Sequence, residues 1–289
     1  MSQVSAENDP TLTRFESRRD AFSWRWVATA VSFAVFGVTS LLLSVTLMPL
    51  LRLLPAARSQ RWSRHVLQKG MRTYLGLLRI LGVYTYDLEG RERLGLPGQL
   101  IVANHPTLID ALFLIAFTPQ AVCVAKYSMF RNPLIWNVVA ACRFISNART
   151  IDMIEGISAA LARGECVIMF PEGTRTQPGQ PLVFQRGAAN VAVRAATRVT
   201  PVYIRCSPLT LTKAEPWYRI PPRRPHFSLK VGADLPLDDY RKMSSIPMGS
   251  RAFNARLCEH FEDELQRMDG YTGASPRRPP QGRPSAGNE

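Results

Sequence analysis

A histidine and an aspartate five positions apart could act as an acid–base pair in this chain. His105 and Asp110 lie in the segment NHPTLID (104–110), between a strand-like apolar run and a helix-like one. A tight turn between the two runs would bring the side chains together. A neutral imidazole can remove a hydroxyl proton at physiological pH, while a carboxylate fixes the imidazole tautomer and stabilises the imidazolium. The pattern therefore predicts activation of a hydroxyl group as a nucleophile.

The same segment also has a purely structural interpretation. Thr107 could cap the N-terminus of the helix, and Asp110 would favour the positive end of the helix dipole without any catalytic role. His105 would then be an ordinary loop residue. Because the spacing alone does not separate these interpretations, a second motif has to decide between them.

The second motif is FPEGTRT (170–176), which follows the apolar, strand-like run CVIM. Gly173 allows the backbone to approach a ligand closely, and Arg175 can hold an anionic oxygen with its guanidinium fork. In isolation, the segment is equally compatible with a strand-to-loop turn that carries a surface Glu–Arg pair.

Together, the two motifs resemble the lysophospholipid acyltransferase family, in which they occur in the same order. The likeness covers roughly residues 85–235. It implies that His105 is the general base and that Asp110 orients it. It also implies direct acyl transfer from acyl-CoA or acyl carrier protein, without an acyl-enzyme. The acceptor-binding residues that it implies are Glu172, Gly173, Thr174 and Arg175.

One position departs from the family pattern. A middle motif in the family ends in an arginine credited with gripping the acceptor phosphate, whereas here Phe144-Ile145-Ser146 is followed by Asn147. Arg149 is our candidate for a replacement, and Arg143 is another. Alternatively, an asparagine at this position indicates an acceptor that carries no phosphate there.

The predicted function is that of an O-acyltransferase that moves a fatty acyl group to the hydroxyl of a lysophospholipid. The simplest acceptor is 1-acylglycerol-3-phosphate, which would become phosphatidic acid. A phosphate-free or secondary-metabolite lipid acceptor is the alternative, and an inactive, basic membrane- or lipid-binding protein is an alternative of another class. Backbone amides beside His105 are our hypothesis for the oxyanion stabiliser. We expect no metal and no cofactor, with acyl-CoA or acyl-ACP as co-substrate.

The remaining pattern indicates how these motifs are positioned. Short β-like runs alternate with helix-like runs, which predicts an α/β domain with a mixed, largely parallel sheet flanked by helices. Residues 208–225 are rich in proline and predict an extended excursion. The expected strands are 84–90, 99–104, 121–126, 142–146, 165–170, 199–205 and 226–231, and the expected helices are 108–117, 133–140, 151–162, 188–196 and 250–268.

An uncharged apolar run over residues 27–51 predicts an N-terminal membrane-anchoring helix, because such a helix is long enough to cross a bilayer. Its flanking Trp and Arg residues suit the membrane interface, and they argue against a buried core helix. Residues 66–83 form an amphipathic stretch that either lies on the membrane or packs on the domain. A monotopic anchor made of both helices is also compatible with the sequence.

Charge and composition complete the expected organisation. The chain has 36 Lys and Arg against 22 Asp and Glu, a net charge of +14, which favours anionic partners such as phospholipid head groups. We expect no nucleic-acid partner, because no basic motif is interleaved with aromatic residues. The basic residues after the apolar run predict a domain on the cytoplasmic face of the membrane. The expected segments are a disordered polar leader (1–22), the membrane anchor (23–83), the acyltransferase domain (84–268) and a disordered tail (269–289).

Overall fold

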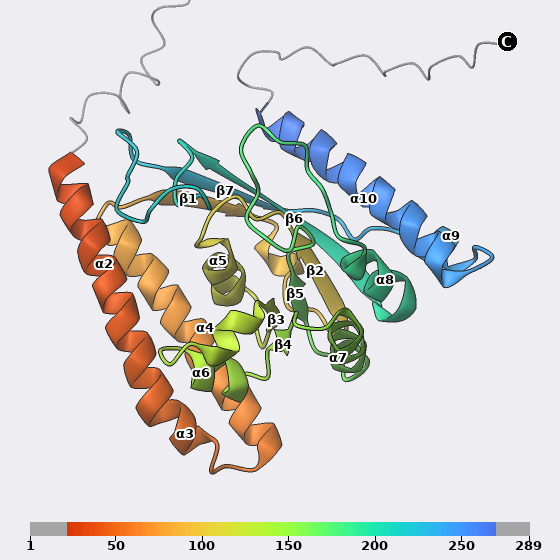
Figure 1. The fold of residues 1–289 in the computed structure, drawn as a ribbon, viewed down its shortest axis with the longest axis horizontal. Coiled ribbons are helices and arrows are strands. Elements are labelled where there is room, and N and C mark those ends of the chain that lie inside the picture. Colours follow the sequence, from red (N-terminus) through yellow and green to blue (C-terminus); the bar gives the residue numbers. More distant parts are fainter. Residues whose placement is uncertain (1–21, 270–289) are drawn as a thin grey trace, which may run out of the picture.

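Seven strands form one sheet, with helices on both of its faces (Figure 1). The computed structural model describes residues 22–269, so the predictions for residues 1–21 and 270–289 lie outside the described residues. The sheet order is β1-β7-β6-β2-β5-β3-β4. Its strands are β1 (Thr85–Glu89), β2 (Gln99–Ala103), β3 (Val122–Ala125), β4 (Ile145–Ser146), β5 (Val167–Met169), β6 (Arg198–Ser207) and β7 (His226–Val231).

All neighbouring strands run parallel except β6 and β7, which are antiparallel. The predicted mixed, largely parallel sheet is therefore confirmed. Strand β2 lies between β5 and β6 and is parallel to both. Because parallel strands end at the same edge of a sheet, the segments that follow β2 and β5 emerge side by side.

Alternate residues of β2 face two separate cores, as expected for a strand covered on both faces. Leu100 and Val102 pack with one set of helices, and Ile101 and Ala103 pack with another. The first set is α7 (Thr150–Ala162), α8 (Arg186–Ala195) and α10 (Ile246–Asp269). The second face is covered by α4 (Ala56–Ile80) and α5 (Asp110–Phe117). The short helices α6 (Trp136–Ala141) and α9 (Asp238–Arg241) complete the described fold.

The N-terminal apolar run folds as one long helix, made of α2 (Phe22–Leu42), a π-helical turn (Leu43–Leu47) and α3 (Met48–Leu51). Within the described residues, Phe22–Leu51 is the one helix whose length and composition would allow it to cross a membrane. Only 22% of its most apolar 18-residue stretch is buried in the protein. A core helix of the same composition would be mostly buried, so this surface suits a lipid environment.

Helix α4 packs on the domain through its apolar face, which decides between the two predicted locations of the amphipathic stretch. Leu67, Leu75 and Leu78 are buried on this face, whereas Lys69 and Arg72 are exposed. The helix begins ten residues earlier than the sequence pattern suggested, at Ala56. Its first turns are polar and basic, which hides their helical character from an apolar pattern.

The excursion between β6 and β7 contacts the N-terminal helix α2. Arg25, which is buried, donates hydrogen bonds from its guanidinium to the carbonyl oxygens of Pro221 and Arg223, at 3.0 and 3.4 Å. The rings of Phe33 and Trp217 lie 5.1 Å apart between centroids. An apolar helix thus holds the proline-rich segment through one buried cation and one aromatic contact.

Candidate active site

The end of strand β2 places His105 beside Asp110. The side chain of Asn104 replaces the backbone in pairing with β6: its amide donates to the Ile204 carbonyl, and its oxygen accepts from the Ile204 N–H, both at 2.8 Å. The backbone then turns out of the sheet at His105. The His105 Nδ1 atom lies 2.8 Å from Asp110 Oδ2, so the predicted meeting of the two side chains is confirmed as geometry.

Asp110 is fully buried and accepts hydrogen bonds at both carboxyl oxygens. The Thr107 N–H donates to Oδ2 and the Thr107 hydroxyl donates to Oδ1, each at 2.6 Å. Burial raises the pKa of the Asp110 carboxyl, and the hydrogen bonds from His105 and Thr107 oppose this rise. An ionised Asp110 accepts the Nδ1 proton of His105, which leaves Nε2 as the basic ring nitrogen.

Two details differ from the structural expectations at this turn. Thr107 does not cap α5, because its hydroxyl binds Asp110 and the N-cap position of α5 is Ile109, without a side-chain cap. The hypothesis that amides of the turn stabilise an oxyanion is also wrong for the amides nearest His105. The N–H groups of His105, Thr107 and Leu108 donate to Glu172, Asp110 and Leu211, respectively, and Pro106 has no N–H.

Glu172 ties the second motif to the first. Its Oε1 atom accepts hydrogen bonds from the His105 N–H and the Thr176 hydroxyl, both at 2.8 Å. The Thr176 N–H returns a 2.7 Å bond to the His105 carbonyl. Burial raises the pKa of the Glu172 carboxyl, and the hydrogen bonds that it accepts from the His105 N–H and the Thr176 hydroxyl oppose the rise. The sequence assigned Glu172 to substrate binding, whereas the structure shows it joining the loops after β2 and β5.

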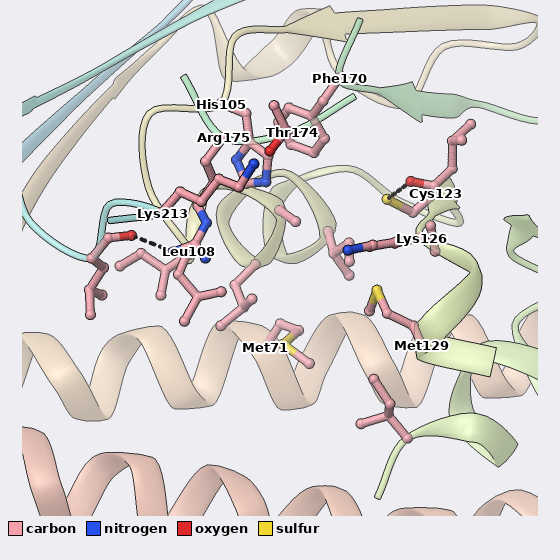
Figure 2. Close-up of a pocket in the computed structure, with 18 of the residues that line it drawn as sticks. Met71, His105, Leu108, Cys123, Lys126, Met129, Phe170, Thr174, Arg175 and Lys213 are labelled. Carbon is pink, nitrogen blue, oxygen red and sulfur yellow. Dashed lines mark hydrogen bonds between the residues drawn. The ribbon is translucent and has the colours of Figure 1, made fainter. Parts of the chain in front are cut away.

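Other residues of the second motif line a cavity together with His105. Gly173, whose φ is +68°, Thr174 and Arg175 all contribute to the lining. The Arg175 Nη1 atom donates to the carbonyl oxygens of Leu211 and Thr212 at 2.9 and 2.8 Å. In the close-up, Thr174 and Arg175 lie with His105 at one side of the cavity (Figure 2). Phe170 stacks on the His105 ring with 4.3 Å between centroids.

Arg149 lies away from this group. Its side chain is 77% exposed and forms an ion pair with Asp152 at 3.6 Å, and it is not among the described residues that line the cavity. Arg143, which is exposed, does not line the cavity either. Asn147 does line it, but its Oδ1 atom accepts the Tyr127 N–H at 3.0 Å. The position of the missing family arginine is therefore occupied by a side chain that stabilises the turn after β3.

The cavity has a volume of about 1050 Å³ and reaches from His105 to the N-terminal helices. This volume slightly exceeds the roughly 300–1,000 Å³ range of small-molecule sites. Its apolar wall includes Phe33 and Phe36 of α2, Met71 of α4 and Ile115 of α5. The candidate base therefore opens into a largely apolar space that the N-terminal helix helps to enclose.

Lysines that the sequence analysis missed also line the cavity. Lys126 follows β3, and Lys213 belongs to the excursion between β6 and β7. Both are labelled in Figure 2, where Lys126 lies across the cavity from His105. Neither lysine belongs to one of the two motifs that the sequence analysis singled out. Each reaches the cavity only through the tertiary fold, so the sequence pattern did not mark it.

Residues 86–205 match a family model described as "Acyltransferase", a range that contains both motifs. These residues therefore resemble an acyltransferase domain. The predicted resemblance is thereby confirmed; it was expected over roughly residues 85–235, so the match begins one residue later and ends about thirty residues earlier. The match ends within β6, so α10 and the excursion after β6 lie outside it.

Two curated relatives that match part of the chain both carry the name 1-acyl-sn-glycerol-3-phosphate acyltransferase. Human 1-acyl-sn-glycerol-3-phosphate acyltransferase alpha is 33% identical over 143 residues, covering 44% of this chain and 49% of the human protein. The 1-acyl-sn-glycerol-3-phosphate acyltransferase of Pseudomonas aeruginosa is 28% identical over 145 residues, covering 48% of this chain and 56% of that protein. The chain thus spans about half the length of these relatives.

A solved structure resembles most of the chain in fold. The crystal structure of the 1-acyl-sn-glycerophosphate acyltransferase from Thermotoga maritima aligns with a TM-score of 0.65 at 18% identity. The alignment covers 86% of this chain and 97% of that protein. The shared fold therefore extends beyond the acyltransferase domain into the surrounding helices.

Proposed function

We propose that this protein transfers a fatty acyl group from a thioester to the hydroxyl of a lysophospholipid. The simplest acceptor is 1-acylglycerol-3-phosphate, and the product is then phosphatidic acid. One observation carries the proposal: a single cavity joins the His105–Asp110 pair to an apolar space of about 1050 Å³. The names of the curated relatives support the same acceptor.

The reaction needs one base and no covalent enzyme intermediate. Nε2 of His105 takes the proton of the acceptor hydroxyl as its oxygen attacks the thioester carbonyl. Asp110 stabilises the imidazolium that forms and keeps its Nδ1 proton in place. Collapse of the tetrahedral intermediate breaks the carbon–sulfur bond and releases the thiolate, which takes the proton from the imidazolium and leaves as the thiol. Phe170 packs against one face of the imidazole and restricts its rotation.

The two substrates make different demands on the cavity. The apolar wall from α2, α4 and α5 accommodates a hydrocarbon chain, because burying each methylene group contributes about 0.8 kcal/mol. Either acyl-CoA or acyl carrier protein serves as donor in this proposal, and the chemistry requires no metal or cofactor. The Arg and Lys side chains among the residues that line the cavity suit the phosphate of either donor.

The proposed location is a membrane surface, with α2 as the anchor. The exposed apolar side chains of α2 would face lipid, while its opposite side encloses the cavity. We propose that the domain lies on the cytoplasmic face of the inner membrane, in line with the basic residues that follow the apolar run. This arrangement lets a lysophospholipid enter from the membrane without leaving an apolar environment.

The test compares the wild type with His105→Ala in detergent. Labelled acyl-CoA and labelled acyl carrier protein are each offered with 1-acylglycerol-3-phosphate, and phosphatidic acid is measured. The wild type should form product and the variant should be slower by about 10²- to 10⁴-fold. His65→Ala is the matched control, since His65 is exposed on α4 and does not line the cavity. Equal rates for wild type and His105→Ala would contradict the proposed base.

A phosphate-free acceptor is the second candidate, and Asn147 is the observation that favours it. Its side chain carries no charge and binds the Tyr127 amide. The same assay with monoacylglycerol distinguishes the two acceptors. Faster transfer to monoacylglycerol than to its phosphorylated counterpart would favour the second candidate.

A further inference from the structure

A second pocket, the α4 pocket, lies on a different side of α4 from the catalytic cavity. It has a volume of about 600 Å³ and is formed by α4, the 3₁₀ turn Arg91–Arg93 and the end of α5. None of the described residues that line it also lines the catalytic cavity. Its lining includes His65, Lys69, Arg72, Arg91, Glu92 and Phe117.

Helical geometry accounts for this separation. Leu67 and Met71 line the catalytic cavity, and Lys69, two residues from each, lines the α4 pocket. Residues two apart in a helix do not face the same way, so Lys69 points away from the catalytic cavity. The two cavities are therefore separate sites, and the α4 pocket has no part in the proposed reaction.

The α4 pocket is basic. Lys69, Arg72 and Arg91 are exposed cations, and Glu92 is the one carboxylate among the described residues that line the pocket. Within the described part of the chain, the charged groups of the three cations form no hydrogen bond or ion pair. The pocket therefore carries a net positive charge, which favours an anionic ligand.

Arg72 and Arg91 converge on one aromatic ring, although they come from different elements. Their Cζ atoms lie 5.9 and 5.1 Å from the centre of the Phe117 ring. Each guanidinium gains a cation–π contact, but the two like charges repel each other. A phosphate bound by both would replace this repulsion with attraction, and the guanidinium fork matches the geometry of phosphate oxygens.

The surroundings of the pocket indicate which phosphate compound it binds. Trp62, Lys69 and Ile80 lie in line on α4, because seven and eleven residues correspond to about two and three helical turns. Trp62 is 53% exposed and Ile80 is 85% exposed. The Trp62 ring contacts the ring of His65 in the pocket, with 5.9 Å between centroids. Exposed apolar groups thus adjoin a basic pocket, which matches a lipid with hydrocarbon chains and an anionic head group.

Helix α4 also lies beside α2, the proposed membrane anchor (Figure 1). The Tyr74 hydroxyl donates to the Ser32 carbonyl of α2 at 3.2 Å, and the rings of Tyr74 and Phe36 lie 5.2 Å apart between centroids. The exposed apolar residues of the two helices therefore belong to neighbouring elements. With α2 in contact with lipid, the α4 pocket lies close to the phosphates of the membrane surface.

We propose that the α4 pocket binds the phosphate of an anionic bilayer phospholipid that is not a substrate. The inference rests on the membrane location given under the proposed function. Arg72 and Arg91 bind the phosphate oxygens, and Lys69 contributes its ammonium. The acyl chains lie against the exposed apolar side of α4 that includes Trp62. This lipid orients the domain on the bilayer without occupying the catalytic cavity.

The test measures lipid binding to the full chain in a neutral detergent by isothermal titration calorimetry. The ligands are dihexanoylphosphatidylglycerol, dihexanoylglycerol, which has no phosphate, and inorganic phosphate. The double variant Arg72→Gln/Arg91→Gln should weaken binding of the phosphatidylglycerol by about tenfold and leave that of dihexanoylglycerol unchanged. Arg72→Lys/Arg91→Lys keeps both charges and should retain more of the affinity, with circular dichroism confirming that both double variants fold.

Two further variants locate the site of any loss. Arg58→Gln/Arg61→Gln removes the same charge from exposed residues of α4 outside the pocket lining, and it should bind phosphatidylglycerol as the wild type does. Met71→Trp narrows the catalytic cavity and should also leave this binding unchanged.

Three results would overturn the inference. The first is equal affinity of the wild type and Arg72→Gln/Arg91→Gln for the phosphatidylglycerol, and the second is an equal or larger loss in either locating variant. The third is inorganic phosphate that binds as tightly as the phospholipid, since the ligand would then be a soluble phosphate. An unchanged acceptor KM in Arg72→Gln/Arg91→Gln would support a site separate from catalysis. Lipid binding through the two arginines in a protein that transfers no acyl group would contradict only the proposed reaction.

Discussion

Nδ1 of His105 and Oδ2 of Asp110 lie 2.8 Å apart, and the aspartate is fully buried while the histidine lines a cavity. Asp110 is therefore inaccessible to a substrate, whereas His105 can contact one. The same Asp110 oxygen also accepts the Thr107 N–H, so the carboxylate is fixed before any substrate binds. Preorganisation of this kind is what a general base requires.

Replacement of Asp110 by Asn tests the charge of this pair separately from its shape. The Thr107 hydroxyl can rotate to accept from the new amide group, and the amide oxygen can still accept from His105 and the Thr107 N–H. The fold should therefore be retained, while kcat falls by about 10²- to 10⁴-fold because the imidazolium loses its counter-charge. Acyl-transfer kinetics and circular dichroism of Asp110→Asn check this. Asp152→Asn, on an exposed site of α7, is the control.

The pH dependence of stability should also change in Asp110→Asn. The folded-state pKa of Asp110 is raised by burial above its unfolded value of about 3.9. The stability contributed by this group is therefore fully present below the unfolded pKa and is lost as the pH rises through the folded pKa. Melting temperatures measured from pH 4 upward should shift in favour of Asp110→Asn relative to wild type. A difference that stays constant over this range would show that the pKa of Asp110 is not raised.

The sequence predicted most of the helices and strands and both motifs, because these depend on local patterns, but it missed α9 and made β4 three residues too long. Apolar runs marked β2 and β5, and parallel neighbours necessarily bring the segments after them to one edge. Local patterns also located α5 to within two residues. The same reasoning failed for the first turns of α4, because their polar residues lack the helical periodicity of apolar side chains.

The composition of the cavity was not predictable from sequence in the same way. Lys213 and Lys126 come from segments that are far apart in sequence, and only the fold brings both to the same cavity. Arg149 was chosen for its closeness in sequence to Asn147, but the start of α7 directs it toward solvent, where it pairs with Asp152. Glu172 was assigned to the substrate by its motif, yet its hydrogen bonds to His105 and Thr176 become visible only in three dimensions.

Glu172 should matter as a link between the two loops. Glu172→Ala removes the acceptor for two donors, the His105 N–H and the Thr176 hydroxyl, at a cost of about 1–3 kcal/mol for each buried group left unpaired. We expect a lower melting temperature and a reduced kcat. Glu172→Gln keeps an oxygen at this position and should retain most of the stability. Glu155→Ala on the exposed side of α7 serves as control, and an equal effect of both alanine variants would contradict the link.

The apolar wall should select among acyl donors by length. Met71 on α4 lines the cavity, and in Figure 2 it lies below the group of polar side chains that includes His105. A larger side chain there removes volume from the space assigned to hydrocarbon, so Met71→Trp should lower kcat/KM for long acyl-CoA donors more than for short ones. Thr73→Trp is a matched control, since Thr73 is exposed on the same helix outside the cavity lining. Rates for a series of acyl-CoA lengths decide the question: a uniform loss across the series would place the acyl chain elsewhere.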